Sequence, residues 1–245
     1  MRNKKKKYPF FRAFFEEKHY LCIRNIVTKH NFMNRKDKFV ITINRELGSG
    51  GRTVGRLLAE ELAVDFYDKA VVDALQEKYK LTIGEIEGLK GRSHSFWAEL
   101  KRSIIGSERE AIANYYYVNS PVKGYPPTSE EMFKAETEIL QSLAEEESCV
   151  VAGRSGFYVF RNHPNHLNIL IQATMPYRIQ RVMRKQNMTE AEARMTIEKV
   201  DKMRENYVKK YTKTSRYDTR NYDLVICADG KTEEEIVELI LKFIS

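Results

Sequence analysis

The stretch that most constrains the fold of this chain is residues 39–62, FVITINRELGSGGRTVGRLLAEEL. It begins with an apolar, β-branched run that is typical of a buried strand. A glycine-rich turn follows, and apolar residues at helical spacing follow the turn. A strand, a glycine turn and a helix in this order present backbone N–H groups and a helix N-terminus to an anion. We therefore expect a phosphate site at this turn.

The turn is close to the phosphate-binding pattern G-x-x-x-x-G-K-[ST]. Gly51, Arg52 and Thr53 supply the last glycine, a cation and the hydroxyl, with Arg in place of Lys. Arginine keeps the charge and can contact two phosphate oxygens at once. Glu46 stands where the first glycine is expected, so its carboxylate must point away, pair with Arg45 or help to hold Mg²⁺. The alternative is a turn whose glycines serve only tight packing.

Apolar runs and helical segments alternate along the rest of the chain. Besides residues 39–43, we expect strands at 64–67, 148–152, 167–171 and 222–227. Such alternation predicts an α/β fold with a five-stranded parallel sheet and helices on both faces. Because parallel sheets bind ligands at the carboxyl ends of their strands, the residues that follow the strands are the candidates for a site.

Three of these strand ends carry residues suited to one phosphorylated ligand. The glycine turn follows the first strand, Asp68 follows the second, and Gly153 and Arg154 follow the third. Asp68 is suited to an acceptor hydroxyl or a metal-bound water, and Arg154 to the phosphate of an acceptor. Their convergence on one edge is better evidence for phosphoryl transfer than any single motif.

Basic residues gather on the predicted helix at 175–187 and in the segment after it. Arg178, Arg181 and Lys185 are spaced to share one face of that helix. Residues 209–220 are polar, charged and turn-rich, which is what a mobile flap needs. We interpret residues 178–220 as a lid that closes over a triphosphate and excludes water. The alternative is a solvated basic face.

The net charge of +8 belongs to one end of the chain. Residues 1–38 carry 12 Lys and Arg against three acids, so the remaining residues are close to neutral. This distribution argues against nucleic-acid binding by the body of the protein. Residues 1–37 could form an arm for a membrane surface or a polyanion, but we expect a dispensable, poorly ordered extension. Met33 would make a natural start.

The cysteines and the hydropathy place the protein in a broad class. Cys22, Cys149 and Cys227 are far apart, and we interpret Cys149 and Cys227 as core residues in a reducing cytosol. We therefore expect a cytoplasmic protein. No apolar run approaches the length of a membrane span.

Four segments together resemble the cytidylate kinase-like family, a branch of the P-loop nucleoside monophosphate kinases. They are NRELGSGGRTVGRLLAEEL, FYDKAVV, CVVAGRSGFYVF, and the series MPYRIQRVM, VDKMRENYVKKYT and NYDLVI. The resemblance covers roughly residues 38–245. It implies a three-layer P-loop kinase domain with a helical acceptor-binding lobe at about 79–146 and a lid.

The resemblance also implies a reaction and a set of roles. The reaction is ATP- and Mg²⁺-dependent phosphoryl transfer to a small-molecule nucleotide, with (d)CMP giving (d)CDP. Residues implied for ATP are Gly48, Ser49, Gly50, Gly51, Arg52, Thr53 and Arg178, with Thr53 also holding the metal. Asp68 and Arg154 would hold the acceptor, and Arg52, Arg181 and Arg204 would act in catalysis.

Two other hypotheses stay open from the residues alone. One is a P-loop kinase that acts on another small acceptor. The other is a non-catalytic, nucleotide-binding regulatory protein whose extension contacts nucleic acid or a membrane, and Glu46 in the phosphate loop keeps that hypothesis open.

Overall fold

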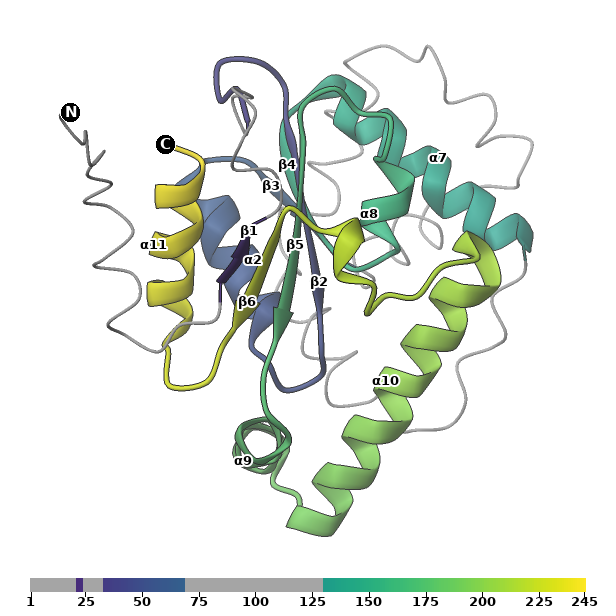
Figure 1. Ribbon diagram of the computed structural model, residues 1–245. Helices are drawn as coiled ribbons and strands as arrows, with labels where there is room; N and C mark the ends of the chain where they lie inside the picture. The colour runs from purple at the N-terminus through teal and green to yellow at the C-terminus, as the bar shows by residue number, and fades with distance from the viewer. Residues whose placement is uncertain (1–20, 24–32, 69–129) are drawn as a thin grey trace, which may run out of the picture.

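The computed structural model describes residues 21–23, 33–68 and 130–245, and it shows a six-stranded sheet between two layers of helices (Figure 1). The strand order is β1-β6-β5-β2-β4-β3. The strands are β1 (Leu21–Ile23), β2 (Val40–Arg45), β3 (Asp65–Tyr67), β4 (Cys149–Ala152), β5 (His166–Gln172) and β6 (Leu224–Cys227). The helices are α2 (Gly51–Glu61), α7 (Glu130–Glu146), α8 (Gly156–Val159), α9 (Met175–Gln186), α10 (Glu190–Thr212), η1 (Thr219–Asn221) and α11 (Glu233–Phe243).

The five strands β3, β4, β2, β5 and β6 are parallel, as the alternation of strands and helices predicts. β2 is central, with β4 on one side and β5 on the other. The chain therefore places β3 and β4 on one side of β2 and then β5 and β6 on the other, which is the arrangement that opens a ligand crevice at the carboxyl ends of the strands. The phosphate-loop sequence follows β2 at this point.

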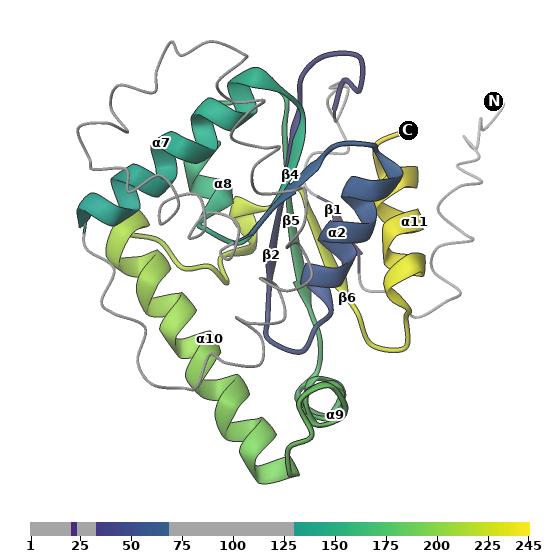
Figure 2. The same ribbon diagram turned by 180° about the vertical axis from the view of Figure 1, so that it is seen from behind.

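The two faces of β2 pack against different layers. Ile41 and Ile43 are fully buried in the core cluster that includes Val54 and Leu58 of α2 and Ile240 of α11. Figure 2 shows α2 and α11 side by side on that face of the sheet. Helices α7, α8 and α10 lie toward the other face. The result is the three-layer arrangement expected from the sequence.

The helix boundaries follow their capping residues. Thr189 and Thr232 each form a capping box with the glutamate three residues later, Glu192 and Glu235. The sequence pattern T-x-x-E predicts capping boxes at Thr128, Thr189 and Thr232, and the structure confirms the last two. A third box, predicted at Thr128, lies outside the described residues.

The start of the domain differs from the expectation. β1 lies within the predicted extension, and it pairs antiparallel with β6 as a sixth strand. Met33 is buried in the core, and the backbone N–H of Asn34 donates to Asn165 Oδ1 at 2.9 Å. Residues 21–23 and residues 33–37 therefore contact the domain, although they lie within the range 1–37 expected to be an extension. The rest of the extension and residues 69–129 of the expected acceptor lobe lie outside the described residues.

No helix in the described part of the chain has both the length and the apolar character needed to cross a bilayer.

Candidate functional site

The phosphate loop, residues 46–50, joins β2 to α2 through two glycines in the left-handed region. Gly48 has φ of 87° and Gly50 has φ of 84°, conformations that residues with a Cβ rarely adopt. Gly50 is the N-cap of α2, and having no side chain it leaves the start of the helix without a side-chain cap. The N–H groups of the first turn have no acceptor within the helix. This geometry suits the oxygens of a phosphate.

Ser49 maintains the shape of the loop. Its side chain is buried, and its hydroxyl donates to the carbonyl oxygens of Glu46 at 3.0 Å and Ile171 at 3.1 Å. Its backbone N–H also donates to the Glu46 carbonyl at 3.3 Å. The Ser49 side chain therefore ties the loop to the end of β5.

Glu46 points toward the junction of β5 and α9. Its Oε2 accepts a hydrogen bond from the Ala173 N–H at 3.0 Å, and its Oε1 lies 3.3 Å from Nη1 of Arg178. Of the three possibilities raised by the sequence, the structure shows the carboxylate turned to this junction, where it is ion-paired with Arg178. A carboxylate can therefore stand in this loop without facing the helix start.

Asp201 of α10 is the centre of a buried ionic network beneath the loop. Its Oδ1 accepts the Leu47 N–H at 3.1 Å and lies 3.4 Å from Arg216 and 3.5 Å from Arg204. Its Oδ2 pairs with Arg178, whose Nε donates to the Leu47 carbonyl at 2.8 Å. Both backbone polar groups of Leu47 are thus held by side chains from α9 and α10.

Arg216 joins this network from the segment after α10. Its side chain is fully buried, and it donates to the carbonyl oxygen of Arg45 as well as approaching Asp201. The Tyr222 hydroxyl donates to the Arg216 carbonyl at 2.7 Å, and burial raises the pKa of Tyr222 to about 12. In this structure the segment expected to be a flap is therefore anchored by Arg216 to the end of β2, next to the phosphate loop.

Two cations predicted to act on phosphates lie near the start of α2. A Cβ added to Gly50 would lie 3.5 Å from Cζ of Arg181, which is ion-paired with Glu233 of α11. Burial, with the nearby charge of Arg181, lowers the pKa of Lys185. Burial is the larger cause of this shift, and the positive charge of Arg181 adds to it.

The residues expected to bind the acceptor lie at two other strand ends. Nε of Arg52 donates to Asp68 Oδ2 at 2.5 Å, directly after β3. Arg154, after β4, is ion-paired with Glu136 of α7, and its guanidinium lies 5.4 Å from the ring centroid of Tyr207. The structure thus joins Arg52 to Asp68, and it holds Arg154 between α7 and α10.

The structure brings most of the predicted residues together around residues 46–53, namely Arg178, Arg181 and Arg204 with the loop, and Arg52 with Asp68. Sequence reasoning missed Asp201, Arg216 and Glu136. Their partners lie far away in sequence, so no local pattern shows which side chains they meet, although Asp201 lies in the quoted segment VDKMRENYVKKYT. The weak signal available was a lone Asp among the basic residues of 199–210.

The donor set fits a nucleotide phosphate with Mg²⁺. The left-handed Gly48 and Gly50 lead directly into a helix start without a side-chain cap, and Thr53 lies in the first turn of α2. Among the described residues, no three His, Cys, Asp or Glu side chains form a metal site of their own. Mg²⁺ bound through phosphates needs only one or two protein ligands, so a hydroxyl such as that of Thr53 is the kind of ligand required.

Comparisons with known proteins agree with this arrangement. A family model described as the cytidylate kinase-like family matches residues 40–229. The comparison with curated proteins returned no match. Among solved structures, an uncharacterized protein from Eubacterium ventriosum ATCC 27560 is 22% identical with a TM-score of 0.59, over 84% of this chain and 98% of that chain.

Two kinases are also among the similar structures. Shikimate kinase from Acinetobacter baumannii is 17% identical, with a TM-score of 0.43 over 86% of this chain and 97% of that chain. A gluconokinase from Sinorhizobium meliloti 1021 is 14% identical, with a TM-score of 0.43 over 84% of this chain and 91% of that chain.

Proposed function

The chain belongs to the cytidylate kinase-like family, and we propose that it catalyses ATP- and Mg²⁺-dependent phosphoryl transfer to a nucleoside monophosphate, with (d)CMP as the acceptor. The family and the three-layer parallel sheet are those of P-loop kinases. The observation that carries the proposal is the phosphate loop itself. Its left-handed glycines lead into a helix start without a side-chain cap, beside Arg181.

The proposed division of labour follows the strand ends. Residue 48 and residues 50–53 would hold the phosphates of ATP with their backbone N–H groups, and Thr53 would hold Mg²⁺. Ser49, predicted to bind ATP, has its N–H and hydroxyl bonded within the protein, so it would act by shaping the loop. Asp68, paired with Arg52, and Arg154 would hold the acceptor on the other side of the sheet edge. When bound, ATP supplies the phosphoryl group and Mg²⁺ neutralises part of its charge.

The arginines of α9 and α10 have distinct surroundings. Arg181 lies beside Gly50 and is suited to charge on the phosphates. Arg204 is partly exposed, 3.3 Å from the carbonyl oxygen of Arg45, and suited to a similar role. Arg178 is buried and donates to the carbonyl oxygen of Leu47, so it stabilises the conformation of the loop. A direct contact between Arg178 and ATP stays a prediction.

An acceptor panel tests the proposal. Purified protein with ATP and Mg²⁺ is offered CMP, dCMP, UMP, AMP and non-nucleotide acceptors, and ADP release is measured. We expect turnover with CMP and dCMP above every other acceptor. Turnover only with another acceptor would favour a P-loop kinase of different specificity. ATP binding without turnover on any acceptor would favour the non-catalytic, regulatory alternative.

A further inference from the structure

We infer that Arg45, the last residue of β2, is a catalytic residue of the phosphate loop, whose guanidinium contacts the phosphoryl group in transfer. This inference deepens the proposed function and rests on it. It is based on the position of the Arg45 side chain, which occupies space that is available because residues 51 and 153 are glycines.

The backbone of Arg45 is held on both sides. Its N–H donates to Asn44 Oδ1 at 2.9 Å, and its carbonyl oxygen accepts from Arg204 at 3.3 Å and from Arg216. Arg45 is also in register with Ile171 of β5. With its Cα fixed by these contacts, the direction in which its side chain leaves the sheet is fixed as well.

The side chain of Arg45 occupies the space that side chains at Gly51 and Gly153 would take. A Cβ at Gly51 would lie 2.6 Å from Cβ and 3.2 Å from Cγ of Arg45. A Cβ at Gly153 would overlap its Nη1. The side chain thus runs from the start of α2 to the turn after β4, along the carboxyl edge of the sheet.

The sequence around Arg45 gains a second interpretation from this path. Moved one residue toward the N-terminus, the pattern G-x-x-x-x-G-K-[ST] spans residues 45–52. In this register Gly50 is the last glycine, Gly51 stands at the position of the lysine and Arg45 at that of the first glycine, whereas the hydroxyl position is matched by Thr53 only in the 46–53 register. The cation and the glycine have exchanged places, and Arg45 fills the volume that a side chain at residue 51 would otherwise enter.

The position of the guanidinium suits the transferred group. The aliphatic stem of Arg45 contacts Gly51 at the start of α2, and its guanidinium lies against Gly153, so the side chain spans the proposed sites of donor and acceptor. Arg52 is held by Asp68 at the end of β3, and Arg181 is paired with Glu233. Of these three arginines, Arg45 is the one whose path joins the two proposed sites.

The chemistry required of Arg45 is electrostatic. The bond from the γ-phosphorus to the bridging oxygen of ADP breaks, and a bond from the γ-phosphorus to an acceptor phosphate oxygen forms. Arg45 would donate hydrogen bonds to the oxygens of the moving phosphoryl group while keeping its own protons. The products are ADP and the nucleoside diphosphate.

An exchange of residues tests this role. Arg45→Gly removes the cation, and Gly51→Lys adds one that collides with Arg45, so each single variant should lower kcat by about 10²-fold or more. The double variant R45G/G51K removes the collision and restores a cation, so it should recover at least about 10-fold over Arg45→Gly. A folded double variant that recovers nothing, or an Arg45→Gly variant within about threefold of the parent, would overturn the inference.

Binding measurements separate this inference from the proposed function. ATP affinity is measured by calorimetry for the same proteins, with Arg56→Ala as the control on the exposed side of α2. If the parent turns over no acceptor, the proposed function fails. If ATP affinity is lost in Arg45→Gly and regained in the double variant, Arg45 still contacts the phosphates of ATP. Unchanged affinity in Arg45→Gly then counts against that placement.

Folding is monitored by the thermal midpoint of each variant. If Arg45→Gly does not fold, Arg45→Met replaces it, because methionine keeps the aliphatic part of the side chain without its charge. Arg45→Met should show the same loss of kcat with a thermal midpoint close to that of the parent. Full activity in a folded Arg45→Met protein would refute the role.

Discussion

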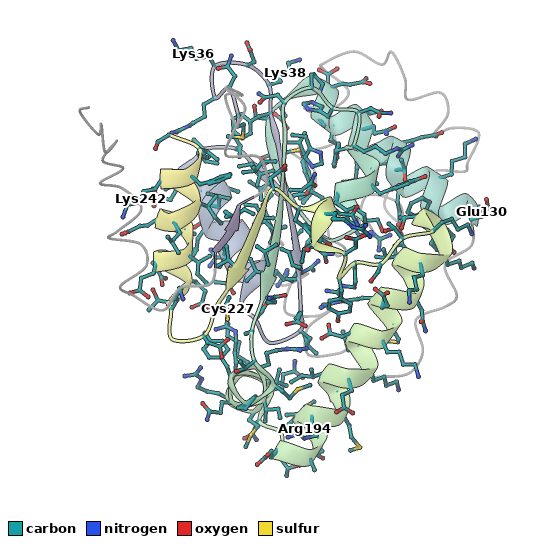
Figure 3. The ribbon with its side chains drawn as sticks, viewed as in Figure 1. Lys36, Lys38, Glu130, Arg194, Cys227 and Lys242 are labelled. Carbon is teal, nitrogen blue, oxygen red and sulfur yellow. The ribbon has the colours of Figure 1, made fainter. Side chains whose placement is uncertain are left out.

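The two edges of the central sheet differ in how they satisfy their polar groups. At the amino edge, where Figure 3 labels Lys36 and Lys38, neutral hydrogen bonds predominate. Asn165 donates to the carbonyl oxygens of Asn34 at 2.7 Å and Lys38 at 3.0 Å. The Ser148 hydroxyl accepts the Phe39 N–H at 3.1 Å.

At the carboxyl edge, where Figure 3 labels Cys227, buried charged side chains make the hydrogen bonds to the backbone. Arg178, Arg216 and Asp201 are all buried, and they hold the backbone of residues 45–47. The left-handed residues Gly48 and Gly50 lie on the same edge.

The comparison shows that the free-energy cost of burying charges falls on the carboxyl edge of the sheet. Burying a charged pair gains little stability, whereas removing one partner is strongly destabilising. An edge needed only for stability can use neutral bonds, as the amino edge does. The carboxyl edge must hold an irregular loop in a conformation that binds anions, and it does so with charges that are costly to bury.

The largest expected effect is at the centre of the carboxyl edge. Asp201→Ala leaves Arg178 and Arg216 buried without their shared carboxylate, so the free energy of unfolding should fall by about 3–5 kcal/mol. Urea denaturation measures this loss. Asp201→Asn keeps an acceptor for the Leu47 N–H and should lose less. A loss below about 1 kcal/mol for the alanine variant would mean that the network is dispensable.

Arg52→Ala should lower turnover by about 10²-fold, the scale seen when one preorganised charge-stabilising donor is removed. Steady-state kinetics with ATP and the best acceptor measure it, with Arg56→Ala as the control four residues along α2. Because Asp68 is the partner of Arg52, the thermal midpoint is recorded alongside. Near-normal turnover in Arg52→Ala would remove this residue from the active site.

At the amino edge, His166 should make stability depend on pH. Burial lowers its pKa to about 3, so below pH 6.5 the unfolded state binds a proton that the folded state does not. Stability is therefore lost as the pH falls from about 6.5 toward 3, by about 2 kcal/mol at pH 5. Denaturation at pH 7 and pH 5 measures this change. His166→Gln should reduce the difference, and an equal difference in both proteins would assign it to other groups.

The smallest expected effect is at Asn165, whose hydrogen bonds hold residues 34–38 to the start of β5. These bonds are exposed, so Asn165→Ala should cost only about 1 kcal/mol of unfolding free energy. Turnover should not change, because the residue lies at the edge opposite the phosphate loop. A tenfold loss of turnover would show that the two edges are coupled.

The local patterns of the sequence were sufficient for the fold class and the phosphate loop. Apolar runs predict the five parallel strands, and the glycines predict the loop after β2. Thr189 and Thr232 predict the starts of α10 and α11, because capping depends on residues three positions apart. These features involve only near neighbours in the chain, so they can be identified without the fold.

The tertiary structure alone decided which charges meet. The bond from Leu47 to Asp201 spans 154 residues, and the bond from Arg216 to Arg45 spans 171. Nothing local marks such pairs, since they exist only after α9, α10 and the segment that follows pack on the carboxyl edge. The same holds for β1, which is a strand of only three residues and pairs with the far end of the chain. Composition and spacing therefore locate the phosphate loop, whereas long-range packing determines the side chains that support it.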